Sequence, residues 1–148
     1  MEKKIIIFMP SIEGGGVEKN LFIIGNYLSK KFNNVSLITV SKRFRSKFNK
    51  KINFISPSMK FWDQLNRKIK YLIAIILLIK ELTKNRNSIV LSFQANIYCL
   101  IICKVFFVKN VSRSNSAPSG WSKNIIKRLI FKIFFKFSDK IIVNSFQF

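Results

Sequence analysis

Short apolar runs rich in β-branched residues alternate with longer stretches of helical character along the whole chain. Continuous apolar runs bounded by turn residues are typical of strands that are buried on both faces. The sequence predicts strands at residues 4–9, 35–40, 52–55, 88–93, 110–114 and 140–143, and helices at residues 17–31, 59–83, 94–107 and 121–137. This order predicts the α/β fold class: a doubly wound, Rossmann-like and mostly parallel sheet with helices on both faces. The length of 148 residues corresponds to one such domain, spanning residues 1–148.

The charge balance is strongly basic, with 27 Lys and Arg against 6 Asp and Glu and a formal net charge of +21. Hydrophobic residues still make up 49% of the chain, which is enough apolar material for a core and argues against a disordered polycation. The basic segment Lys42–Lys51 lacks helical periodicity and is expected to be a solvated loop.

Histidine is absent from the sequence, which excludes a His-dependent catalytic triad, a His-ligated metal and a His general base. The two cysteines, Cys99 and Cys103, are spaced i, i+4 in an apolar run and would share one helix face. Two buried structural thiols are favoured over redox or metal chemistry, which would want more ligands nearby. No metal and no cofactor are expected.

Apolar runs near the N-terminus and in the middle of the chain bear on targeting. Ile5–Met9 is too short for the apolar region of a signal peptide. Tyr71–Ile79 and Ile97–Val108 fall short of the roughly 20 residues that a membrane-spanning helix needs. We therefore expect a cytoplasmic protein.

In a doubly wound sheet, ligands bind outside the carboxyl ends of the strands. This rule directs attention to four places: residues 11–16, the loop after Val40, residues 94–96 and residues 113–115.

The first of these places holds three consecutive glycines, Gly14, Gly15 and Gly16, between a predicted strand and a predicted helix. Glycines let the backbone approach a ligand, and the helix N-terminus favours an anion, so a phosphate is the natural guest. The spacing matches neither the dinucleotide-binding nor the P-loop motif. A tight turn without a ligand remains the alternative, and Glu18 could contact a ligand or simply interact favourably with the helix dipole.

Four segments in the same order resemble the family 4 glycosyltransferases, which have the two-domain GT-B fold. Residues 4–40 resemble the opening of that family, with Gly15-Gly16-Val17-Glu18 at its Gly-Gly-x-Glu turn. The strand at residues 88–93, the strand end Val111–Asn115 and the segment Asp139–Ser145 resemble three later segments of the family. The resemblance therefore covers essentially the whole chain.

The resemblance implies a transferase that moves a sugar from a nucleotide-sugar donor to a glycan or lipid-linked acceptor in cell-surface polysaccharide or glycolipid synthesis. Gly14, Gly15, Gly16 and Glu18 would line the cleft beside the donor phosphates and the acceptor. Gln94, Arg113, Ser114 and Asn115 would lie on the acceptor side, although a solvated loop position is an equal alternative for Arg113.

The role that the family gives to a His at this strand end cannot be carried over, so no catalytic residue is assigned. The second family domain, which carries a Glu-x7-Glu motif and binds most of the donor, has no counterpart in the sequence. We therefore expect an N-terminal GT-B domain, incomplete at its C-terminus and inactive alone.

The predicted C-terminal helix combines aromatic and basic residues. One stripe, Ile126, Leu129, Ile130, Ile133 and Phe137, is expected to face the sheet. Phe131 and Phe135 would then be exposed beside Lys127, Arg128 and Lys132, a combination suited to an anionic membrane surface at the inner face of the cell membrane. The alternative is that another element buries these two rings.

Two non-catalytic interpretations stay open. A small basic module could bind nucleic acid through the Lys42–Lys51 loop, but no recognised motif supports it, and no nucleic-acid partner is expected. The chain could also be a peripheral membrane protein without a ligand in its cleft.

Overall fold

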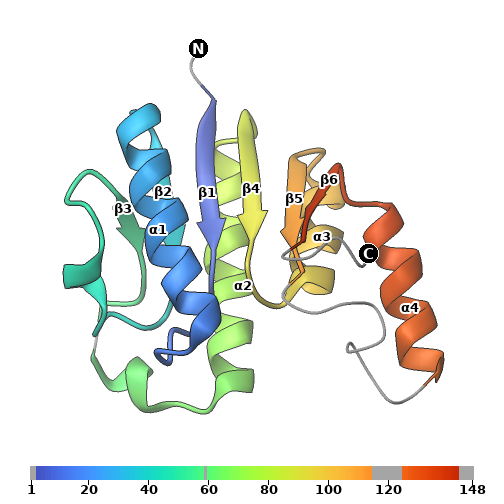
Figure 1. Cartoon of the computed structure of the whole chain (residues 1–148), viewed down its shortest axis with the longest axis horizontal. Helices are drawn as coiled ribbons and strands as arrows, with labels where there is room; N and C mark the ends of the chain where they lie inside the picture. Colours follow the sequence, from blue (N-terminus) through green and yellow to red (C-terminus); the bar gives the residue numbers. More distant parts are fainter. Residues whose placement is uncertain (1–2, 59, 115–124, 144–148) are drawn as a thin grey trace.

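The computed structural model describes residues 3–58, 60–114 and 125–143. Within these residues, six strands and four α-helices follow one another, alternating except between the second and third strands, which only a 3-10 turn separates (Figure 1). The strands are β1 (Lys4–Phe8), β2 (Val35–Ile38), β3 (Asn53–Ile55), β4 (Ser88–Ser92), β5 (Lys109–Arg113) and β6 (Lys140–Ile142). The helices are α1 (Gly16–Lys31), α2 (Arg67–Lys84), α3 (Asn96–Val105) and α4 (Ile125–Lys136), with short 3-10 turns at Arg45–Lys47 and Lys60–Gln64.

The six strands form one sheet in the order β3-β2-β1-β4-β5-β6, and every described pairing is parallel. This is the doubly wound order of Rossmann-like folds, in which the chain reverses direction across the sheet between β1 and β4. The predicted fold class is therefore confirmed. A crevice at the carboxyl ends of β1 and β4 is the expected ligand position in such a sheet.

The central strand β1 is buried on both faces because alternate residues enter two separate cores. Ile5 and Ile7 pack with Leu21 of α1 on one face, and Ile6 and Phe8 pack with α2 and α3 on the other. Helix α1 thus covers one face, while α2 and α3 cover the second, with α4 beside α3 at the β6 end (Figure 1). This arrangement explains the continuous apolar sequence of β1.

Two predicted segments differ from the structure. The helix expected from residue 59 begins at Arg67, because the side chain of Asn66 caps it by accepting from the backbone N–H of Ile69 at 3.0 Å. The prediction of a solvated loop at Lys42–Lys51 is wrong for its aromatic residues. Phe48 is buried, and its ring centroid lies 5.1 Å from that of Phe22 in α1. These rings anchor the basic segment to the core.

The two cysteines are free and fully buried on the inner face of α3, as the spacing predicted. Burial raises the pKa of the Cys99 thiol well above its ordinary value, and a hydrogen bond with Cys103 raises it further. The described residues contain no cluster of metal-ligating side chains. Among the same residues, no helix combines the length and apolar character needed to cross a membrane.

Asp139 joins the last two strands. Its Oδ2 accepts from the backbone N–H of Asn110 at 2.8 Å and from Nζ of Lys104 at 3.4 Å. The hydrogen bond from Asn110 is the main reason why the pKa of Asp139 lies below its ordinary value. The carboxylate therefore stabilises the fold only while it is ionised.

We expect Asp139→Asn to lower the free energy of unfolding by about 1 kcal/mol at neutral pH, since the carboxylate is partly exposed and solvent weakens its interactions. The contribution of the carboxylate is present above the unfolded-state pKa of about 3.9 and is lost as pH falls through the lower folded-state pKa. Urea denaturation between pH 7 and pH 3 should thus show the two proteins converging at the acid end. A gap that stays constant with pH would contradict this account.

Candidate functional site

The glycine-rich turn leads from β1 into α1, as the sequence predicts. Gly14 adopts φ of +93°, a backbone conformation that side chains other than glycine rarely take. A Cβ atom added there would also lie 3.4 Å from the ring of Phe44. Gly16 has open space on its Cβ side. The turn therefore needs glycine at Gly14 for its shape and leaves room beside Gly16.

Glu18 bends back onto this turn. Its side chain is buried, and its Oε1 accepts from the backbone N–H of Glu13 at 3.3 Å. Its Oε2 lies 3.0 Å from the position that a Cβ atom at Gly15 would occupy. The carboxylate of Glu18 thus contacts the backbone of the turn at the N-terminus of α1.

The carboxyl ends of β1, β4 and β5 are connected by side-chain amides. The backbone N–H of Ser11, after β1, donates to Oε1 of Gln94 at 3.3 Å. Nδ2 of Asn96 donates to the backbone carbonyl of Arg113 at 2.8 Å. Ala95 lies between the two amides at φ of +51°, in the left-handed region that non-glycine residues seldom adopt. This strained turn lets Gln94 contact the β1 side while Asn96 contacts the β5 side.

Arg113 lies at the end of β5 and is only 2% exposed. Its guanidinium carbon lies 5.2 Å from the ring centroid of Phe93, within the range of a cation–π contact. Burial lowers the pKa of Arg113 from its ordinary value, although an arginine remains charged at neutral pH. The structure therefore rules out the alternative of a solvated loop arginine.

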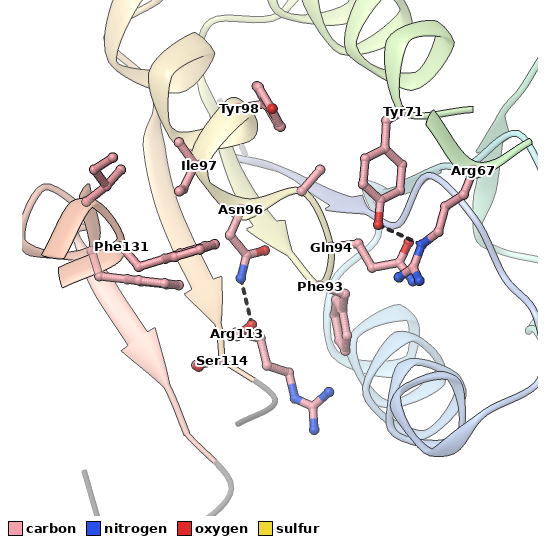
Figure 2. Close-up of a pocket in the computed structure, with 13 residues that line it drawn as sticks. Arg67, Tyr71, Phe93, Gln94, Asn96, Ile97, Tyr98, Arg113, Ser114 and Phe131 are labelled. Atoms are coloured by element: carbon pink, nitrogen blue, oxygen red, sulfur yellow. Dashed lines mark hydrogen bonds between the residues drawn. The ribbon is translucent and has the colours of Figure 1, made fainter. Parts of the chain in front are cut away.

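A cavity of about 590 Å³ opens at this edge of the sheet, between the starts of α2 and α3 and the inner side of α4 (Figure 2). Gln94, Arg113 and Ser114, three of the four acceptor-side residues that the sequence singled out, line it. Asn115 lies outside the described residues. Gly14, Gly15, Gly16 and Glu18 are not among the lining residues. The hydrogen bond between Ser11, which precedes the glycine turn, and Gln94 connects the turn to the cavity.

Asn96, within the segment 94–96 to which the sequence directs attention, also lines the cavity. Three further polar lining residues were not singled out by the sequence: Arg67, Tyr71 and Tyr98. Nε of Arg67 donates to Oη of Tyr71 at 2.8 Å, and Figure 2 shows this pair beside Gln94. Helices that follow parallel strands begin at the carboxyl edge of the sheet, so polar residues in a first helical turn are candidates for the same site. This rule would have identified Arg67 from the sequence only if the start of α2 had been predicted correctly.

Helix α4 is turned the opposite way from the prediction. Phe135 is buried and Phe131 is half-buried, and their rings stack with centroids 6.5 Å apart at the cavity wall. The stripe expected to face the sheet is exposed instead: Ile126, Leu129, Ile130, Ile133 and Phe137. The expectation that both rings are exposed, on which the predicted membrane contact depends, is therefore wrong, and the structure agrees with the alternative in which packing covers them. Lys132 is exposed, Arg128 is half-buried, and the side chain of Lys127 lies outside what the structure describes.

The cavity combines aromatic walls with two arginines and several hydroxyl and amide groups. Guanidinium and amide groups bind phosphate oxygens and sugar hydroxyls, and aromatic rings pack against sugar or acyl surfaces. Its described lining contains no carboxylate, so these residues can bind and orient a ligand but include no carboxylate base.

Comparison with known proteins gives a fold relative but no sequence family. No protein-family model and no curated protein matches the chain. A solved structure of a UGT transferase from Siraitia grosvenorii in complex with UDP is similar, with a TM-score of 0.52 and 14% sequence identity. The similarity covers 78% of this chain and 29% of that one, so the chain corresponds to less than a third of that transferase. The likeness shows that the α/β fold of this chain also occurs as part of that UGT transferase.

Proposed function

We propose that this chain is the acceptor-side, N-terminal domain of a GT-B glycosyltransferase of the family 4 type. The observation that carries the proposal is the convergence of Gln94, Asn96 and Arg113 at the carboxyl ends of β4 and β5, next to the switch point between β1 and β4. This is the position at which doubly wound domains bind ligands.

The proposed division of labour follows from the two parts of the crevice. The glycine turn faces the phosphates of a nucleotide-sugar donor, and the cavity between α2, α3 and α4 holds a glycan or lipid-linked acceptor. Arg113 contacts the donor phosphates from the border of the cavity, Asn96 holds the Arg113 backbone through its carbonyl, and Gln94 connects the cavity to the residues after β1. A second domain supplies most of the donor site, so residues 1–148 bind weakly and do not turn over alone. The fold likeness to a UGT transferase in complex with UDP supports a nucleotide-sugar partner.

Amide chemical-shift mapping tests the proposal on the 148-residue chain. We expect UDP to perturb the amides of Gly14–Gly16, Gln94, Asn96 and Arg113, with weak affinity because only one side of the donor site is present. Inorganic sulfate at equal ionic strength is the control, since a chain of charge +21 attracts any anion. Perturbations that are equal for UDP and sulfate, or scattered over lysines far from the crevice, would overturn the proposal.

A further inference from the structure

The outer surface of the helical layer formed by α2, α3 and α4 is unusually apolar. In α2 the buried residues Ala74 and Leu78 face the sheet, and Leu72 and Ile76 on the opposite side are 60% and 56% exposed. Helices α3 and α4 likewise expose apolar residues on the side opposite their buried residues. The exposed apolar residues of the three helices that do not line the cavity are Ile69, Leu72, Ile76, Ile79, Ile101, Val105, Ile125, Ile126, Leu129, Ile133 and Phe137. We name this set the outer apolar face.

The outer apolar face is continuous between α3 and α4. An apolar groove of about 280 Å³ lies between these helices, lined by Leu100, Ile101, Lys104, Val105, Phe134 and Phe137. Apolar patches of this extent are uncommon on monomeric proteins and mark a contact with another surface. By contrast, α1, on the other side of the sheet, exposes only Ile23 and Tyr27 among its large hydrophobic residues.

The charges around the outer apolar face are predominantly positive. Exposed cations are present on each helix: Lys68, Lys80 and Lys84 on α2, Lys104 on α3, where it pairs with Asp139, and Lys132 and Lys136 on α4. Helices α3 and α4 contain no acidic residue, and the one in α2, Glu81, pairs with Lys4 at 2.6 Å. The rim therefore presents cations around an apolar centre.

We propose that the outer apolar face rests on an anionic lipid bilayer, with its apolar side chains in the headgroup region and its cations on the lipid phosphates. A second copy of the chain is disfavoured as the occupant, because pairing two such faces would oppose like charges on proteins of formal charge +21. This contact does not depend on the proposed transferase function. On α4, the proposed membrane contact lies on the side opposite Phe131 and Phe135, the two residues that the sequence predicted for this role.

Vesicle flotation tests the contact on the whole chain. We expect binding to vesicles of phosphatidylcholine with phosphatidylglycerol to exceed binding to phosphatidylcholine alone by about tenfold or more, and to fall with added salt. The double substitutions Leu129→Ser/Ile133→Ser and Leu72→Ser/Ile76→Ser should each weaken binding about tenfold, since each removes two exposed apolar side chains from the face.

Matched controls lie on the other side of the sheet. Ile23→Ser/Tyr27→Ser on α1 removes comparable exposed apolar side chains and should leave vesicle binding within about twofold of the original. Equal loss in the α1 variant, or no preference for anionic vesicles, would overturn the proposal. So would sedimentation showing a dimer that the α2 and α4 variants dissociate while vesicles bind nothing. Far-ultraviolet circular dichroism verifies that each variant is folded.

Discussion

Phe135→Ala is expected to lower the free energy of unfolding by about 3 kcal/mol, a large part of the stability of a typical domain. Phe135 is only 7% exposed, and its ring stacks on that of Phe131. Removing the ring deletes apolar contacts and leaves a cavity that the surrounding side chains fill only in part. Urea denaturation followed by circular dichroism measures the change.

Phe137 provides the matched control within the same segment, because it is 59% exposed. Phe137→Ala makes the same chemical change and should alter the free energy of unfolding by less than about 0.5 kcal/mol. The reverse ranking, with Phe137 costly and Phe135 neutral, would mean that α4 presents its aromatic stripe outward after all. The pair of variants therefore tests the orientation of α4 directly.

The helix orientation illustrates what sequence periodicity cannot decide. Residues 125–137 are apolar nearly all round, so the stripe through Ile126 and Ile133 and the pair Phe131 and Phe135 were both candidates for the buried side. Lysines did not resolve the choice because their long side chains can reach water from the border of either stripe. The strands were predictable because β1 and β4 are apolar on both faces, which only a central position in a parallel sheet explains.

The site was predictable to the extent that it follows from topology. Gln94, Arg113 and Ser114 lie at or just beyond the carboxyl ends of β4 and β5, and one general rule for parallel sheets places them together. Arg67 and Tyr71 depend on where α2 begins, which the cap at Asn66 sets within a segment that reads as continuous helix. The turn at Ala95 depends on a backbone conformation that has no signature in an alanine.

Arg113→Gln is expected to weaken the binding of UDP to the chain by about tenfold to a hundredfold. A charge-assisted hydrogen bond contributes about 1.5–3 kcal/mol, which corresponds to that range. The UDP affinity of Arg113→Lys should lie between that of the original chain and that of Arg113→Gln. Lysine keeps the charge but lacks the planar guanidinium, which lies over Phe93 and can contact two oxygens at once. Titration followed by amide chemical shifts gives the three affinities.

Arg86→Gln removes the same charge from an exposed position just before β4, at the opposite edge of the sheet. Its affinity for UDP should stay within about twofold of the original if the effect at Arg113 is local rather than a consequence of lower net charge. Arg113 could also serve only to pack on Phe93; Arg113→Gln would then lower the midpoint of urea denaturation and leave the affinity for UDP unchanged. Measuring both quantities on the same two variants separates a ligand contact from a packing contact, and the second outcome would remove Arg113 from the proposed UDP contacts.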